Sequence, residues 1–217
     1  MKIIFIITIL FNLVYSRQYR GAELRTVDSF LYGRFDARFK PAQGDGLVSS
    51  FFTYNDDNPN TPWAEIDVEV LGVYSNVVDF NTITRGQASH IRQHYVDFNP
   101  HLDFHTYSFE WTPEYVAWFI DDIEVYRQIG SHVDSLYLSQ KIMMNIWNPV
   151  YADWVGAWRS EILPRFSFYD YVSYSEYTPG MGDIGTESNF TFSWKDDFDT
   201  FDYNRWEKSD DHTWGGN

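Results

Sequence analysis

The chain has 217 residues, with 31 acidic and 16 basic side chains, a formal net charge of −15 and no cysteine. Its length suits one domain that buries a substantial core without disulfide or metal support. The acidic balance, without a basic cluster, disfavours nucleic acid and anionic membranes as partners. Aromatic residues make up 20% of the chain, a supply that suits both a core and stacking on the apolar faces of sugars.

The first 16 residues, MKIIFIITILFNLVYS, contain one lysine, a mostly apolar run and a small residue at the end. This is the pattern of a secretory signal peptide, because the run is shorter than the roughly 20 apolar residues that a membrane-spanning helix needs. We expect cleavage after Ser16, a secreted extracellular protein, and a mature chain over residues 17–217.

Short runs rich in Val, Ile, Phe, Tyr and Thr follow one another through most of the chain. Gly, Pro, Asn and Asp separate them, which is typical of antiparallel strands in a sandwich or barrel. The runs cover residues 33–42, 46–54, 64–72, 77–86, 104–128, 141–147 and 165–177. Within 104–128, Thr112–Tyr115 and Ile120–Glu124 predict two tight reversals. No amphipathic helix of a dozen residues is evident, so we expect an all-β, two-layer antiparallel fold.

Residues 178–189, TPGMGDIGTESN, have the composition of a linker. The segment after it, 190–217, holds two strand-like arms, too few for a second domain because an isolated hairpin is marginal in water. We therefore expect residues 17–217 to form one domain, with the last segment packed on the main sheets.

The stretch WAEIDVEVLG places Glu65, Asp67 and Glu69 at alternate positions of an otherwise apolar run. A strand would put the three carboxyls on one face and the branched apolar residues on the other. Paired carboxyls about 5 to 9.5 Å apart are the machinery of glycoside hydrolysis. On a strand, Glu65 and Glu69 have Cα atoms roughly 13 Å apart, so their side chains must lean inward. Asp67 would then hydrogen-bond one of them and help to separate their pKa values.

The motif alone is also compatible with a solvated sheet face whose polar residues all happen to be acidic. Neighbouring like charges repel, however, and lysine partners would be the less costly choice for such a face. The blocks around the motif decide between these interpretations.

Four blocks, residues 32–42, 46–72, 104–122 and 141–148, resemble glycoside hydrolase family 16, and within it the lichenases, the β-1,3-1,4-glucanases of bacteria and rumen organisms. The similarity covers essentially the whole mature chain. EIDVE resembles the lichenase form of the motif, whereas laminarinases of the family usually carry a bulged version one residue longer.

The resemblance implies a concanavalin A-like jelly-roll sandwich with a cleft across one face. It also implies hydrolysis of mixed-linkage β-glucan by a retaining double displacement, without a catalytic cofactor, by a protein that we expect to be a monomer. Glu65 would be the nucleophile, Glu69 the general acid and base, and Asp67 the residue that tunes the pair.

The resemblance further implies a set of sugar-binding residues. These are Glu23, Phe52, Tyr54, Trp63, Asn81, Asn145, Trp147, Trp154, Trp214 and Asn217. Lichenases usually carry Gln two residues before Asn81, where this chain has Asp79. His105 resembles a family histidine beside the strand of the acidic motif, for which we expect a supporting role.

Family members often bind one calcium ion far from the cleft. By position, Asp170 resembles its side-chain ligand, and Asp197 stands where a backbone carbonyl would be supplied.

In the common lichenase arrangement, the block resembling residues 190–217 comes first in the chain. Here it comes last, so the chain resembles a circularly permuted rumen-type lichenase, a rearrangement that antiparallel sandwiches tolerate when their termini lie close together. The permuted relative continues past GGN with another strand. The resemblance therefore implies either that this sequence is truncated at its C-terminus or that the sheet lacks a strand, which would leave unpaired strand edges.

Two alternatives stay open. A non-catalytic, lectin-like sandwich would bind glucan with its aromatic residues alone, although binding a neutral sugar does not require three acids. A relative acting on laminarin or xyloglucan would keep the chemistry and change the substrate.

Overall fold

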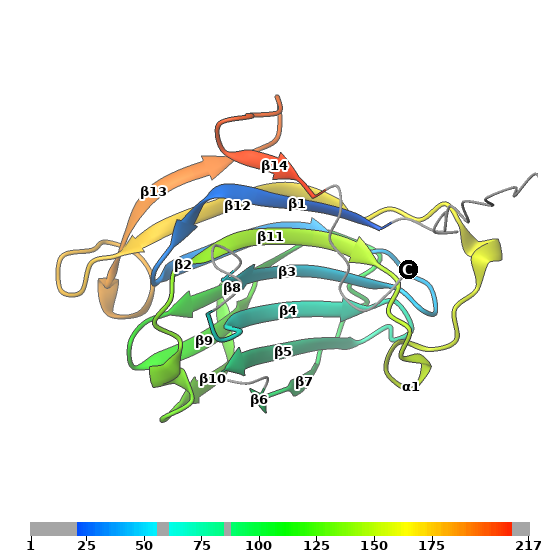
Figure 1. Ribbon diagram of the computed structural model, residues 1–217, viewed down its shortest axis with the longest axis horizontal. Helices are drawn as coiled ribbons and strands as arrows, with labels where there is room; N and C mark the ends of the chain where they lie inside the picture. Colours follow the sequence, from blue (N-terminus) through cyan, green and yellow to red (C-terminus); the bar gives the residue numbers. More distant parts are fainter. Residues whose placement is uncertain (1–20, 56–60, 85–87, 210–217) are drawn as a thin grey trace, which may run out of the picture.

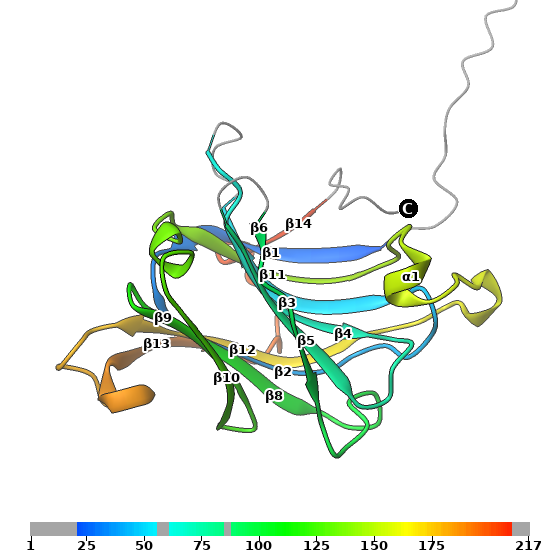
Figure 2. The ribbon, with the colours of Figure 1, turned by 90° about the horizontal axis from the view of Figure 1, so that it is seen from below.

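Two antiparallel β-sheets packed face to face form the molecule (Figure 1). The computed structural model describes residues 21–55, 61–84 and 88–209. One sheet has the strand order β14-β1-β11-β3-β4-β5-β6, with β7 also paired to β5, and the other has the order β10-β9-β8-β2-β12-β13. Figure 2, turned by 90°, shows the sheets as two layers. The predicted all-β sandwich is confirmed.

The strands of the eight-stranded sheet are β1 (Ala22–Phe30), β3 (Val48–Tyr54), β4 (Glu65–Leu71), β5 (Val77–Thr84), β6 (Ala88–Ser89), β7 (Arg92–Tyr95), β11 (Gln140–Trp147) and β14 (Trp206–Lys208). Those of the six-stranded sheet are β2 (Gly33–Lys40), β8 (His105–Trp111), β9 (Tyr115–Ile120), β10 (Ile123–Ile129), β12 (Phe168–Tyr177) and β13 (Phe190–Asp196). Short helical turns complete the described chain: η1 (Val133–Ser135), α1 (Ala152–Val155), η2 (Ser160–Ile162) and η3 (Thr186–Ser188). None of these is long and apolar enough to cross a membrane.

Both predicted reversals in residues 104–128 are present. The backbone N–H of Thr112 donates to Tyr115 O at 2.9 Å between β8 and β9. Asp121 and Asp122 join β9 to β10 with φ of 47° and 65°, the left-handed pair that a two-residue hairpin turn requires and that aspartate tolerates. These short connections place β8, β9 and β10 side by side in one sheet.

The core lies between the sheets and fixes β4 firmly. Ile66, Val68 and Val70 of β4 are fully buried against it. From the opposite sheet, the indole N–H of Trp118 donates to the backbone carbonyl of Asp67 at 2.9 Å. Trp118 is itself fully buried, so the middle of β4 is held by packing and by a direct bond across the core.

The last segment adds a strand to each sheet, as expected, because β13 pairs with β12 and β14 pairs with β1. Residues 178–189 connect β12 to β13, and hydrogen bonds within this segment hold its two ends together. Thr178 N donates to Asn189 O at 2.8 Å, and Gly180 N donates to Asn189 Oδ1 at 2.9 Å. The predicted linker is thus a bonded connection between paired strands.

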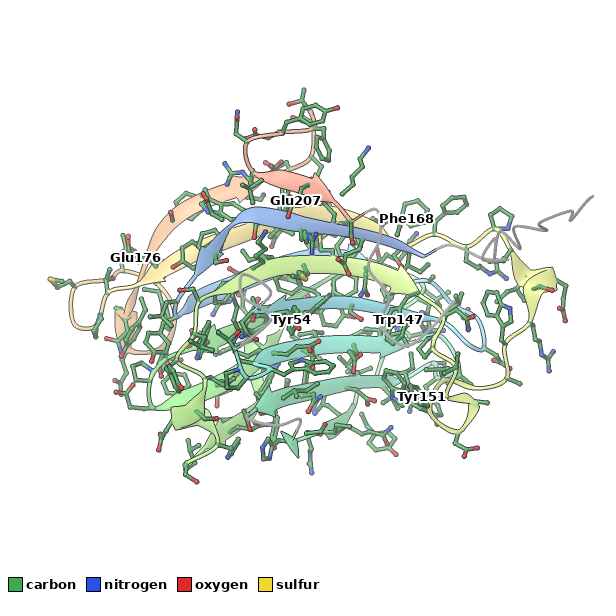
Figure 3. The ribbon with its side chains drawn as sticks, viewed as in Figure 1. Tyr54, Trp147, Tyr151, Phe168, Glu176 and Glu207 are labelled. Atoms are coloured by element: carbon green, nitrogen blue, oxygen red, sulfur yellow. The ribbon has the colours of Figure 1, made fainter. Side chains whose placement is uncertain are left out.

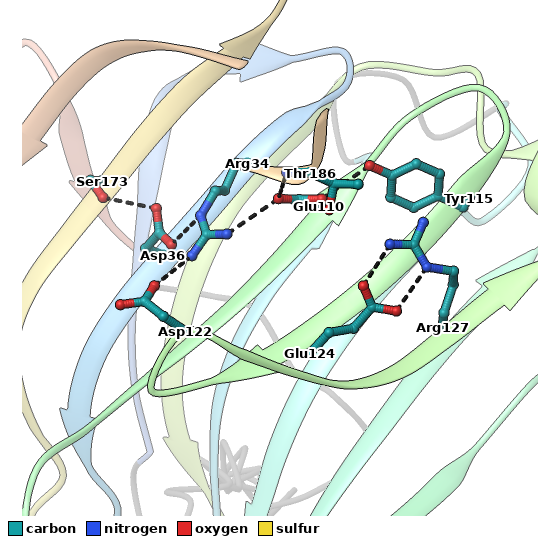
Figure 4. A network of polar contacts seen from close by, with 9 residues as sticks. All are labelled: Arg34, Asp36, Glu110, Tyr115, Asp122, Glu124, Arg127, Ser173 and Thr186. Atoms are coloured by element: carbon teal, nitrogen blue, oxygen red, sulfur yellow. Dashed lines mark hydrogen bonds and ion pairs between the residues drawn. The ribbon is translucent and has the colours of Figure 1, made fainter. Parts of the chain in front are cut away.

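The buried arginine Arg34 contacts three acidic side chains on the outer face of the six-stranded sheet (Figure 4). Its guanidinium lies 2.9 Å from Asp36, 3.2 Å from Glu110 and 2.9 Å from Asp122. We call Arg34 and these three acids the Arg34 cluster. Glu110 is fully buried. Burial lowers the pKa of Arg34, but the contacts with Asp36 and Glu110 outweigh it and raise that pKa above its ordinary value.

Glu110 has two further hydrogen bonds. The Tyr115 hydroxyl donates to one carboxylate oxygen at 3.0 Å, and the backbone N–H of Thr186 donates to the other at 2.9 Å. Thr186 belongs to the connection between β12 and β13, so the cluster fastens this connection to the sheet.

We expect Arg34→Ala to lower the free energy of unfolding by about 3 kcal/mol, because it leaves the buried Glu110 charge without its cation. Urea unfolding followed by tryptophan fluorescence measures the change. Arg159→Ala is the matched control, since its guanidinium is exposed and lies 4.0 Å from Asp45; its effect should stay below about 0.5 kcal/mol. Equal losses in the two variants would contradict a stabilising role for the cluster.

Candidate active site

Strand β4 places Glu65, Asp67 and Glu69 on the face turned away from the core, as the alternation predicted. We call these three residues the acidic row and this side of the sheet the cleft face. Glu65 and Asp67 are 8% and 3% exposed. Glu69 is half-buried. A row in which two of the three carboxyls are buried is not a solvated surface, so that alternative interpretation of the motif is wrong.

The acidic row forms the floor of a cleft of about 300 Å³. The residues that line it are Ser50, Phe52, Trp63, Glu65, Asp67, Glu69, Asn81, Ile83, Ile91, Asn145, Trp147, Tyr151 and Trp154. The cleft therefore brings together nine of the eleven described residues that were predicted as catalytic or sugar-binding; Glu23 and Tyr54 are not in its lining.

Strand pairing sets the neighbours of Asp67. Phe52 of β3 and Asn81 of β5 are its partners on either side. The side-chain oxygen of Asn81 accepts from the backbone N–H of His90 at 2.9 Å and from the Ser89 hydroxyl at 3.1 Å. The Asn81 amide is thereby oriented to bond Asp67 with its nitrogen, an interaction that lowers the pKa of Asp67.

Glu65 and Asp67 share a hydrogen bond. Two carboxyl groups can share one only if one of them carries the proton. Burial, followed by the charges of Glu65 and Glu69, raises the pKa of Asp67 well above its ordinary value. Burial raises the pKa of Glu65 to about 7, opposed by its hydrogen bonds with Asp67 and with the indole N–H of Trp63. Asp67 is therefore the donor, and Glu65 the carboxylate that it stabilises.

Glu69 is the more basic of the two glutamates. Burial first, and then the charges of Glu65 and Asp79, raise its pKa to about 8. At neutral pH it holds its proton, while Glu65 ionises more readily. The row thus offers an acid and a carboxylate on one strand, the division of labour that glycoside hydrolysis requires.

Aromatic side chains stand at both ends of the cleft (Figure 3). At one end Tyr54 packs edge-on against Trp63, with ring centroids 5.8 Å apart. At the other end Trp147 and Trp154 meet at 6.2 Å, beside the exposed Tyr151. Such surfaces can stack on the apolar faces of sugar rings.

Glu23 lies on β1 opposite Asn145 of β11. Both residues border an adjoining cavity of about 470 Å³. The charge of Glu23 contributes to the raised pKa of Glu65, so Glu23 acts on the acidic row from the β1 side.

Four lining residues were not predicted. Ser50 and Ile83 share the cleft face with Phe52 and Asn81, so strand alternation could have identified them. Tyr151 and Ile91 lie outside regular strands, where no periodic signal marks the side that a residue faces. Two predicted residues, Trp214 and Asn217, fall outside the described residues, as does the predicted signal peptide.

The resemblance implied that His105 lies beside β4, but the structure places it elsewhere. It is on β8 of the other sheet, where its ring stacks on Phe98 at 3.7 Å and bonds Asp121 at 2.7 Å. Its place is structural, in agreement with the supporting role.

The predicted calcium residues each have a cationic partner. Asp170 lies 2.6 Å from Arg38, and Asp197 lies 2.7 Å from Lys195. Within residues 21–55, 61–84 and 88–209, no three His, Cys, Asp or Glu side chains gather as metal ligands. The resemblance assigns Asp197 through its backbone carbonyl, which the side-chain pair with Lys195 does not involve, and Asp170–Arg38 is a partly exposed pair. Calcium binding at these residues therefore stays a prediction.

Sequence comparison identifies relatives of this chain. Residues 9–161 match the profile described as Glycosyl hydrolases family 16. A β-glucanase of Fibrobacter succinogenes is 40% identical over 210 residues, which cover 94% of this chain and 59% of that protein. A β-glucanase of Bacillus subtilis is 36% identical over 155 residues, covering 71% of this chain and 62% of that protein. The chain thus spans less than two thirds of the length of these relatives.

Solved structures agree with the sequence comparison. A Bacillus licheniformis β-glucanase superposes with a TM-score of 0.65 at 34% identity, over 70% of both chains. A β-1,3-1,4-glucanase (lichenase) from a mouse hindgut metagenome gives 0.64 at 37% identity, over 71% of this chain and 78% of that one. By its sequence, its jelly-roll sandwich and its acidic cleft, the chain belongs to glycosyl hydrolase family 16.

Proposed function

We propose that the protein is a secreted endo-β-1,3-1,4-glucanase that hydrolyses mixed-linkage β-glucan. The observation that carries the proposal is the buried acidic row in an aromatic-walled cleft. Relatives at 36 to 40% identity are named β-glucanases, and a structural neighbour is named a lichenase. The apolar run at residues 1–16 supports secretion.

The proposed mechanism is a retaining double displacement. Glu65, as the carboxylate, attacks the anomeric carbon while Glu69 donates its proton to the departing glycosidic oxygen. Glu69, now ionised, then takes a proton from water, and that water cleaves the glycosyl–Glu65 ester with a second inversion. Asp67 supports the first step by donating a hydrogen bond to Glu65. The aromatic walls hold the sugar rings on either side of the bond that breaks.

We also propose that the order of the chain is circularly permuted. Uneven coverage supports this proposal: the Fibrobacter relative aligns over 94% of the chain, whereas the Bacillus subtilis relative aligns over 71%. An alignment keeps the order of both chains. It would therefore leave out residues 190–217 if the Bacillus subtilis relative carried the corresponding segment at its N-terminal end.

A lectin-like role and an enzymatic role are separated by Glu65→Gln. This change keeps the shape of the side chain and removes the nucleophile, so we expect lichenan hydrolysis to fall more than about a thousandfold. Lichenan binding, followed by affinity electrophoresis, should persist. Glu161→Gln, at an exposed position, is the control with full activity expected. Unchanged hydrolysis in Glu65→Gln would exclude Glu65 as the nucleophile.

The pH dependence of kcat/KM should form a bell. Glu65 must be ionised to attack, so with a pKa of about 7 activity falls below neutrality. Glu69 must be protonated to donate, so with a pKa of about 8 activity falls above that pH. The limbs report the interacting row rather than isolated residues. Initial rates on lichenan between pH 3 and 10 measure both limbs, and activity that already falls as the pH rises through the ordinary glutamate value of about 4.3 would contradict the raised pKa of Glu69.

Substrate preference is tested by comparing lichenan, laminarin and xyloglucan. Strand β4 pairs with both neighbours through Glu65 to Glu69 without a bulge, in keeping with the lichenase form of the motif. We expect kcat/KM on lichenan to exceed that on the other two by at least about tenfold. Faster cleavage of laminarin or xyloglucan would retain the enzyme and replace its substrate.

A further inference from the structure

Asp79 is a buried carboxyl beside the acidic row that the proposed mechanism does not use. It lies on β5 directly opposite Glu69 of β4 and is only 2% exposed. Its neighbours Val78 and Phe80 are fully buried in the core, so by alternation Asp79 faces the cleft side. Directly opposed strand residues have Cβ atoms about 4.5 to 5.5 Å apart, which puts the two carboxyl groups within strong electrostatic reach.

The contacts of Asp79 come from two elements. The side chains of Trp154, on α1, and of Gln93, its partner on β7, hydrogen-bond the Asp79 carboxylate. Its Oδ1 atom is buried and has no hydrogen-bond partner within the described residues. Since Trp154 lines the cleft and Asp79 does not, Asp79 stands behind the wall that Trp154 forms.

We propose that Asp79 is a positioning residue of this site, which holds Trp154 in the cleft wall and acts electrostatically on Glu69. The inference rests on the proposed function, in which Glu69 is the proton donor. Asp79 lies behind the lining and acts only through these two residues.

Among the described residues, the charges that act on Glu69 are of one sign. Glu65 acts from the same strand and Asp79 from β5, while Ser50 is the uncharged partner on β3. The lining residues described above include no Lys, Arg or His. No cation of the cleft wall therefore offsets the repulsion from Asp79.

The charged residues of β7 point the other way. Arg92 and His94 flank Gln93 and so lie on the opposite face of the strand. Arg92 lies 5.7 Å from the Tyr126 ring, and His94 lies 5.9 Å from the ring of Phe80. Neither offers Asp79 a counter-ion.

The direction in which Asp79 changes the pKa of Glu69 follows from the charge state of Asp79. Burial raises the pKa of Asp79 to about 6, opposed by its hydrogen bonds with Trp154 and Gln93. Above that pH the group is an anion, and an anion beside Glu69 disfavours loss of the Glu69 proton. Asp79 thus extends the range over which Glu69 can act as an acid.

The first test is Asp79→Asn, which removes the charge and keeps an oxygen that can accept from Trp154. We expect the alkaline limb of kcat/KM on lichenan to move down by about one pH unit, with KM at pH 6 unchanged. Asp79→Gln, the residue that lichenases usually carry there, is a second neutral variant should the first not fold. Asp79→Ala removes the acceptor as well and should raise KM about fivefold.

Asp153→Asn, an exposed acid on α1, is the control and should leave both limbs and KM in place. An alkaline limb that stays put in the neutral variants, or an unchanged KM in Asp79→Ala, would overturn the proposal. Titration of the Glu69 carboxyl by NMR in ¹³C-glutamate-labelled protein, assigned with Glu69→Gln, gives a readout independent of turnover. If the parent chain did not cleave lichenan, the proposed function would fail, while an equal Glu69 titration in parent and Asp79→Asn would still decide against Asp79.

Discussion

The two faces of β4 impose opposite demands, and the site depends on satisfying both. On one face, branched side chains fill the core and Trp118 bonds the backbone of Asp67 from the opposite sheet. On the other face, three carboxyls stand in a row, two of them buried and the third half-buried. Burying charge is costly unless it is paired or neutralised. The packing and hydrogen bonding of the core face of β4 hold the strand in place despite the repulsion between the carboxyls on its cleft face.

The part of the chain that the structure describes holds the Arg34 cluster and the acidic row, and their buried acids are neutralised differently. In the Arg34 cluster a guanidinium lies among Asp36, Glu110 and Asp122 (Figure 4), so these acids have a cationic partner and serve the fold. The cleft wall supplies no such cation, and the acidic row therefore retains protons. Retained protons are what an acid catalyst must have near neutral pH. Acidic side chains serve the fold in the six-stranded sheet and are suited to acid chemistry in the cleft, because only those of the first group have an arginine as partner.

Much of the fold and the row of acids could be predicted because they depend on local periodicity. The alternation in Glu65–Leu71 indicates both faces of β4, and Asp121 and Asp122 indicate a turn. Strand β1 was missed because it is polar and irregular, with a shift of register between Arg25 and Ser29.

Features set by tertiary contacts were not predictable in this way. Asp170 falls at a register shift between β12 and β2 and pairs with Arg38. The cleft position of Tyr151 depends on how an irregular segment folds back over the sheet. Neither arrangement leaves a pattern in the sequence.

The uniform sign of charge in the cleft also selects among polymers. A glycan chain that carried carboxylate or sulfate groups would bring anions against Glu65 and Glu69, with no basic side chain in the described lining to receive them. An uncharged chain meets no such penalty, and its hydroxyl groups can donate to the carboxylates. The acidic floor therefore disfavours binding of acidic polysaccharides, before the shape of any sugar is considered.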